Sequence, residues 1–269
     1  MKIAVCVKQV PDSWAEKKMA NGLLDRANVD AVLNDLDEYA VEEALRIVEA
    51  NSATGEAGEG SGHSITIISM GPERATEAIR KALSMGADDA ILVSDAALSG
   101  SDALATSLVL SEVIKKGSYD LIICGTESTD ARMSVVPAML AERLGIAQLT
   151  FAGKVNVDPA ASAIEIDRMT EFGVETMNAK MPAVLSVIEK INEPRYPSFK
   201  GIMAAKKKTI TTMSLADAAV AASSVGLSAA WSTVKDALPR PARSAGVKVT
   251  DEGNGGEKLV DFLIEKRLA

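Results

Sequence analysis

Short apolar runs alternate with helical patterns along the first half of this 269-residue chain, and that alternation constrains the fold more than any other feature. The runs are brief, rich in Val, Ile, Ala and Leu, and cover residues 3–7, 64–69, 90–93 and 121–124. Apolar stripes with helical spacing follow them within residues 40–48, 75–83, 104–113 and 136–144. Strands that alternate with helices predict an α/β fold: a doubly wound, mainly parallel sheet with helices on both faces and strand order 3-2-1-4.

The fourth run leads into a stretch with the composition of an anion-binding turn. The run stops at Gly125, and small hydroxyl and acidic residues precede the helical pattern that starts at Val136: Thr126, Glu127, Ser128, Thr129 and Asp130. In a strand, glycine turn and helix, backbone N–H groups can face an anion at the helix N-terminus. The strand order puts the first and fourth strands at the topological switch point, so Cys6 and Lys8 are expected beside Gly125 and Asp130. The stretch has neither a Walker lysine nor the spaced glycines of a dinucleotide fingerprint, and most such turns bind nothing.

After residue 145 the pattern changes. Residues 149–157 and 162–168 are strand-like runs joined across a proline turn, and residues 174–177 and 183–188 continue the strand character. We expect an antiparallel edge that completes a domain of residues 1–190. Residues 191–209 hold prolines, exposed-looking apolar residues and a basic run, which predict a protruding loop. Residues 210–269 are poor in core-forming patterns apart from a closing amphipathic helix, so they form either an arm on a partner or a disordered tail.

Composition excludes several classes of function. The formal charge of −8 and pI of about 4.9 argue against a nucleic-acid partner. Cys6 and Cys124 end apolar runs and are expected to be reduced structural residues. Because the chain has a single histidine, His63, its composition argues strongly against a zinc site and against a Ser-His-Asp arrangement. We see no signal peptide and no apolar run near 18 residues, so a cytoplasmic protein without membrane insertion is expected.

Several motifs occur together along nearly the whole chain. They are Val5–Val10 with Pro11-Asp12, Asn34–Ala44, Met70–Pro72 with Ala82–Asp88, Gly125–Asp130 with Leu140–Gly145, Gly173–Thr176, Met181–Ala183, and Asn192–Tyr196 followed by Ile202-Met203 and Lys206–Lys208. In this combination the chain resembles the β subunit of electron transfer flavoprotein, also called the FixA-type subunit. The resemblance implies an adenine nucleotide α-hydrolase-like, Rossmann-like fold.

The resemblance also implies a function without catalytic residues in this chain. Such subunits form heterodimers with an α subunit that mainly holds a redox-active FAD, while the β subunit holds a structural AMP. The assembly takes electrons from acyl-CoA and related dehydrogenases, as in fatty acid oxidation, and passes them to a quinone oxidoreductase. The C-terminal segment, residues 210–269, would wrap the α subunit.

Site residues follow from matching the family's motifs position by position. The AMP-contacting residues would be Cys6, Asn34, Asp35, Leu36, Asp37, Met70, Gly125, Thr126, Glu127, Ser128, Thr129, Asp130, Ser134, Val135 and Val136. Thr126-Glu127 replace the family's common Lys-Gln, and Ser134-Val135 replace a polar pair, which affects the exact phosphate contacts. Because a second carboxylate beside a phosphate is repulsive, Glu127 is expected to turn away or to meet a cation.

A partner-binding segment follows from the same resemblance. Its residues would be Tyr196, Phe199, Ile202 and Met203, with Phe199 in the place of a leucine that anchors in an apolar pocket of the dehydrogenase. One buried anchor of this kind contributes about 1.5–3 kcal/mol, which suits transient docking. The basic run at residues 206–208 would steer acidic partners.

Three alternatives stay open on the sequence. A bifurcating member of the family would hold a second FAD in place of AMP, and the loop sequence does not distinguish the two. An ATP-hydrolysing or nucleotidyl-transferring enzyme on the same sheet would need a cationic phosphate clamp, and no Lys or Arg occurs between Gly125 and Arg132. A stand-alone nucleotide-sensing module would not need residues 210–269.

Overall fold

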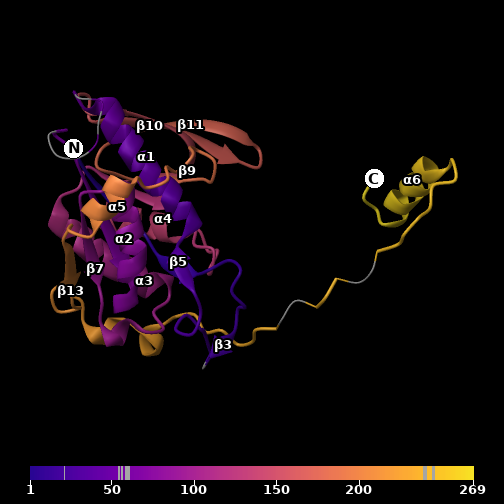
Figure 1. The fold of residues 1–269 in the computed structure, drawn as a ribbon, viewed down its shortest axis with the longest axis horizontal. Helices are drawn as coiled ribbons and strands as arrows, with labels where there is room; N and C mark the ends of the chain where they lie inside the picture. Colours follow the sequence, from indigo (N-terminus) through magenta and orange to yellow (C-terminus); the bar gives the residue numbers. More distant parts are fainter. Residues whose placement is uncertain (21, 54, 56, 58–60, 239–240, 244–245) are drawn as a thin grey trace. The chain divides into compact units, whose positions relative to one another are not determined.

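The computed structural model describes residues 1–269 except 21, 54, 56, 58–60, 239–240 and 244–245. The chain forms two compact units, Met1–Lys235 and Asp236–Ala269. Figure 1 follows the chain through both.

A nine-stranded sheet is the centre of the first unit. Its order is β11-β10-β9-β12-β8-β1-β6-β7-β13. The strands are β1 (Lys2–Cys6), β6 (Ser64–Met70), β7 (Asp89–Val93), β8 (Leu121–Gly125), β9 (Ala147–Asp158), β10 (Ala163–Thr170), β11 (Gly173–Lys180), β12 (Ala183–Val187) and β13 (Ile210–Met213). The first four strands of this sheet along the chain, β1, β6, β7 and β8, lie in the order β7-β6-β1-β8 and pair in parallel, which confirms the predicted order 3-2-1-4.

Helices cover both faces of this sheet. They are α1 (Asp35–Asn51), α2 (Thr76–Met85), α3 (Ala103–Gly117) and α4 (Val136–Leu144), with short 3-10 turns η1 (Glu73–Ala75) and η2 (Ala96–Leu98). Side chains that alternate along β1 separate two cores: Val5 packs with α1 and α2, whereas Ala4 packs with α3 and α4. The largest fully buried side chains are Ile and Leu rather than aromatics, as the 3% aromatic content requires.

The antiparallel edge is confirmed. Strands β9 and β10 form the predicted hairpin, with Asp158 opposite Ala163, and β11 pairs antiparallel with β10. Strand β12 returns to pair in parallel with both β8 and β9, so the hairpin extends the parallel sheet.

The polar segment between β1 and α1 contains two small antiparallel sheets. One joins β2 (Gln9–Pro11) and β5 (Ala31–Leu33), and the other joins β3 (Met19–Ala20) and β4 (Leu23–Leu24). Arg74 fixes the return of this segment, because its guanidinium donates to the carbonyls of Arg26, Ala27 and Val29 at 3.0, 3.0 and 3.2 Å. Periodicity alone gave no indication of this packing.

The predicted protruding loop at residues 191–209 is only partly a loop. Helix α5 (Phe199–Ala205) begins after Ser198, whose hydroxyl accepts from the N–H of Gly201 at 3.0 Å. A Cβ at Gly201 would lie 2.5 Å from the carbonyl oxygen of Ser84, so a larger residue there would push α5 away from α2.

Residues 210–225 pack on the first unit of their own chain. Strand β13 adds to β7, and the turns η3 (Ala222–Ser224) and η4 (Leu227–Ala229) follow. Leu215, Ala218 and Val225 are buried in the core beside α3 and α4. This part of the predicted arm therefore depends on the first unit for its packing.

The second unit carries helix α6 (Gly255–Glu265). Its apolar side chains Leu259, Val260 and Ile264 are exposed. Among the described residues, no helix is both long and apolar enough to cross a bilayer.

Candidate functional site

The turns after β1 and β8 meet at the crossover of the sheet, as the strand order predicts. Cys6 lies opposite Cys124 in the parallel pair, so Lys8 and the loop after Gly125 leave the sheet at the same edge. The N–H and hydroxyl of Thr126 donate to the carbonyl of Val187 at 3.0 and 2.6 Å, which ties the start of the loop to β12.

The N-terminus of α1 closes against Gly125. A Cβ there would lie 2.6 Å from Oδ1 of Asp37 and 2.8 Å from the carbonyl of Leu36, so the strand must end in glycine for the helix to approach. Asp37 is buried and accepts from the N–H of Lys8 at 2.8 Å. Burial raises the pKa of Asp37 to about 7, although hydrogen bonds from Asn34, Lys8 and Gly125 act in the opposite direction.

Asn34 holds the loop that follows β8. Its side chain is fully buried, donates to the carbonyl of Glu127 at 2.9 Å and accepts from the N–H of Thr129 at 3.0 Å. Asn34 occupies the capping position of α1 but makes no side-chain capping bond. The side-chain amide of Asn34 therefore links the start of α1 to a loop about 95 residues further along the chain.

Asp130 is neutralised by two cations. Its side chain is 1% exposed and lies 2.8 Å from Nζ of Lys8 and 2.7 Å from Nη2 of Arg26. Burial alone would raise the pKa of Asp130, but the charge of Lys8 and hydrogen bonds from Lys8, Ser128 and Arg26 lower it to about 2. Sequence reasoning missed Arg26, because it lies in a segment without periodic pattern and only the fold of that segment brings it here.

The rest of the loop, residues 131–135, leads into α4. Arg132 and Ser134 have positive φ angles of 49° and 54°, which turn the chain toward the helix. In the described part of the chain, no protein acceptor is recorded for the N–H groups of Ser134, Val135 and Val136. Glu127 accepts from the hydroxyl of Ser134 at 2.8 Å. Its partner is therefore this hydroxyl group and not the cation that the sequence suggested as one alternative.

The apolar side of the site is formed by half-buried Met70 and Val136 and by the two thiols. Cys6 and Cys124 are free and buried. A hydrogen bond with Cys6 and burial raise the pKa of Cys124 well above its usual value. Neither thiol is positioned as a nucleophile.

Most of the predicted nucleotide residues thus lie around one loop, but Asp35 does not. Asp35 is exposed and lines a separate cavity of about 220 Å³ together with Lys81 and Tyr196. A larger open cavity of about 640 Å³ lies elsewhere, between α3, α4 and the η3–η4 segment, and includes Arg143 and Trp231.

The predicted partner-binding residues are exposed on and next to α5. Tyr196 is 94% and Phe199 80% exposed, and Ile202 and Met203 are also exposed. Lys208 differs from its neighbours in the basic run, because its ammonium donates to the carbonyl of Ala87 and burial lowers its pKa. Of the three lysines in this run, Lys206 and Lys207 are exposed.

The fold defines an α/β protein with a mainly parallel sheet and a polar loop at the crossover of that sheet. Comparison with known proteins gives the family. The model of the electron transfer flavoprotein domain family matches residues 21–218, so this chain belongs to the electron transfer flavoprotein family, as a member of its β-subunit branch. It is 50% identical to the electron transfer flavoprotein subunit beta of Mycobacterium tuberculosis, over 99% of this chain and 98% of that protein.

More distant relatives cover the same length. The chain is 34% identical to the electron transfer flavoprotein subunit beta of Megasphaera elsdenii, over 100% of this chain and 98% of the relative. It is 33% identical to the caffeyl-CoA reductase-Etf complex subunit CarD of Acetobacterium woodii, over 99% and 97%. The family identifies the chain as an electron-transfer protein.

Proposed function

We propose that this chain is the β subunit of a cytoplasmic heterodimeric electron transfer flavoprotein and holds AMP at the crossover of its sheet. Electrons from acyl-CoA-type dehydrogenases pass through a FAD held mainly by the α subunit to a quinone oxidoreductase. The observation that carries the proposal is the loop of residues 125–136, which Asn34 and Asp37 fix against α1 in a chain with full-length similarity to such β subunits.

The residues at the loop fit a nucleotide monophosphate. The N–H groups of Ser134, Val135 and Val136 lie at the start of α4, where donors and the helix dipole favour an anion. Because Lys8 and Arg26 compensate Asp130, that carboxylate does not add an unpaired negative charge to the site. Met70 would offer an apolar surface to the base.

The chain contributes geometry rather than catalytic groups. Its single histidine, His63, lies beside the N-terminal amine, with Nδ1 at 3.0 Å from that nitrogen. His63 precedes the start of β6, whereas Asp130 follows the carboxyl end of β8, and both strands run parallel to β1. The flavin supplies the redox chemistry when it is bound. The residues of this chain order the nucleotide loop, present the docking surface around Phe199 and, through residues 236–269, offer an amphipathic helix to the α subunit.

Identification of the bound nucleotides tests the proposal. The chain would be produced together with an α subunit of the same organism, and acid-released nucleotides would be identified by mass spectrometry. We expect one FAD and one AMP per heterodimer. Two FAD molecules and no AMP would favour a bifurcating-type subunit, and the absence of any adenine compound would refute the nucleotide site.

A matched pair of variants connects the result to the loop. Asn34→Ala removes both bonds that hold residues 127–129, so AMP occupancy is expected to fall. Asn51→Ala, at the other end of α1, removes only a bond to the carbonyl of Ile47 and is expected to leave occupancy unchanged.

A further inference from the structure

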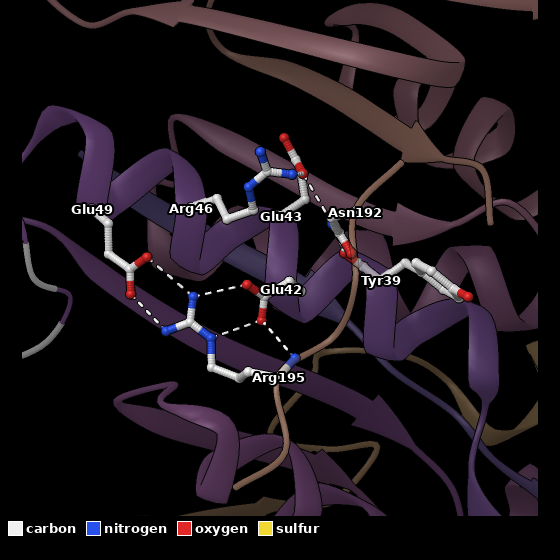
Figure 2. A network of polar contacts seen from close by, with 7 residues as sticks. All are labelled: Tyr39, Glu42, Glu43, Arg46, Glu49, Asn192 and Arg195. Atoms are coloured by element: carbon white, nitrogen blue, oxygen red, sulfur yellow. Dashed lines mark hydrogen bonds and ion pairs between the residues drawn. The ribbon is translucent and has the colours of Figure 1, made fainter. Parts of the chain in front are cut away.

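The segment before α5 is fixed to α1 by a polar network. Figure 2 shows Arg195 between two carboxylates of α1, with Asn192 bound one turn away. The amide of Asn192 donates to the carbonyl of Tyr39 at 3.0 Å and to Glu43 at 2.9 Å.

Arg195 uses both its backbone and its guanidinium. Its N–H, Nε and Nη2 donate to Glu42 at 3.1, 2.7 and 2.8 Å. Nη1 and Nη2 donate to Glu49 at 2.6 and 3.1 Å. The carboxylates are seven residues apart and therefore lie on one face of α1, where the planar guanidinium can pair with both.

The network is partly protected from water. The side chain of Glu42 is 7% exposed, that of Glu49 29% and that of Arg195 35%. Hydrogen bonds with Glu42, then Glu49, raise the pKa of Arg195. Without this cation, the buried carboxylate of Glu42 would lie near Glu43 without its principal counter-charge.

The exposed docking residues lie between two attachment points. Tyr196 follows Arg195 directly and is almost fully exposed, so it does not hold the segment through packing. On the other side of Phe199, α5 rests on α2 at Gly201, and Arg80 donates to the carbonyl of Ala205. The segment that carries Tyr196 and Phe199 is thus attached to α1 on one side and to α2 on the other.

We infer that Arg195 is the positioning residue of this docking surface: its pairing with Glu42 and Glu49 presets the segment that presents Tyr196 and Phe199 to an apolar pocket on the electron donor. The inference rests on the proposed function. A preset segment loses less conformational freedom on docking, so the network acts on the affinity for the donor and leaves the electron-transfer step unchanged.

Chymotrypsin, which cuts after Phe199, measures the fixation of the segment without any partner, whereas Pro197 prevents cleavage after Tyr196. In the purified heterodimer, Arg195→Gln is expected to raise cleavage after Phe199 about tenfold, because cleavage follows the population of the open segment. Cleavage after exposed Phe172 serves as the internal reference. Arg46→Gln is the matched control, since Arg46 contacts Glu43 at 3.6 Å and does not touch Arg195. Unchanged cleavage in Arg195→Gln overturns the inference.

Steady-state reduction of the heterodimer by an acyl-CoA dehydrogenase of the same organism provides the functional measurement. Arg195→Gln should raise the KM for the heterodimer about fivefold to tenfold with kcat within about twofold, and Arg195→Lys should fall between it and the unmodified protein. Should Arg195→Gln not fold, Glu49→Gln removes the more exposed partner and should give a smaller change in the same direction. A fall in kcat with constant KM contradicts positioning.

The two measurements separate the inference from the proposed function. If Phe199→Ala raises KM while Arg195→Gln changes neither KM nor cleavage, docking stands and the inference fails. If no acyl-CoA dehydrogenase reduces the unmodified heterodimer, the partner assignment fails, and the cleavage rates still decide whether Arg195 fixes the segment.

Discussion

The replacement Asp130→Asn tests the electrostatic account of the nucleotide loop. The substitution keeps the size of the side chain but removes the charge that Lys8 and Arg26 approach at 2.8 and 2.7 Å. It leaves two cations without their shared counter-ion beside the loop. We expect a less stable chain at neutral pH.

The magnitude follows from the pKa. The folded protein holds the Asp130 carboxyl at about 2, whereas its ordinary value is 3.8. Because the pKa of Asp130 is lower in the folded protein than in the unfolded chain, the ionised carboxylate stabilises the fold at pH values above 3.8. That stabilisation is lost as the pH falls toward the folded-state pKa of about 2. At about 1.4 kcal/mol per unit, the ionised carboxylate contributes about 2 kcal/mol at pH 7, and about half of this is lost by about pH 3.

Urea unfolding followed by circular dichroism, at pH 7 and at about pH 3, measures the effect. The difference in unfolding free energy between the unmodified chain and Asp130→Asn should be about 2 kcal/mol at pH 7 and should shrink at the lower pH. Asp12→Asn is the matched control, because its carboxylate accepts only from the N–H of Trp14 in an exposed turn. Its expected change is below about 0.5 kcal/mol. Equal stabilities of the Asp130→Asn and unmodified chains at pH 7, or a difference that does not depend on pH, would refute the reasoning.

Three further substitutions or treatments probe the packing around the site. Gly125→Ala places a Cβ 2.6 Å from Oδ1 of Asp37 and should lower the unfolding free energy by about 1–3 kcal/mol, seen as a lower urea midpoint; an unchanged midpoint would mean that α1 can retreat freely. Cys6 and Cys124 are buried, so a thiol reagent should label neither in the native chain and both in urea, and rapid native labelling would contradict their burial. Leu45→Ala opens a cavity in the core between α1 and the sheet and should cost about 2–5 kcal/mol by the same unfolding measurement, with a loss below about 1 kcal/mol arguing against tight packing there.

The sequence was a good guide wherever a pattern was local and repeated. Short β-branched runs and helical stripes predicted the strand order around β1, and that order alone brought Cys6 to the loop after Gly125. The hairpin of β9 and β10 followed from its proline turn in the same way. Each of these predictions depends on a local sequence feature: a short apolar run, a helical stripe or a turn residue.

Contacts between distant segments were harder to predict. Asparagine is a common helix-capping residue, yet the amide of Asn34 binds a loop far along the chain. Two buried backbone groups of that loop need hydrogen-bond partners, and the amide supplies both. Arg26 pairs with Asp130 only because Arg74 folds its segment back. Strand β13 was assigned to the arm, since four residues without alternation carry little signal, although they match the edge of β7.

The central position of β1 affects how the chain folds while it is being synthesised. β1 is matched with β6 on one side, Lys2 with Ser64, and with β8 on the other, Ile3 with Leu121. The far edge of β8 is closed only by β12, where Ala183 pairs with Leu121. A growing chain therefore exposes an unpaired apolar edge until Val187 has left the ribosome, and such edges recruit other strands. Nascent chains cut short before that residue should be the species that most need a chaperone.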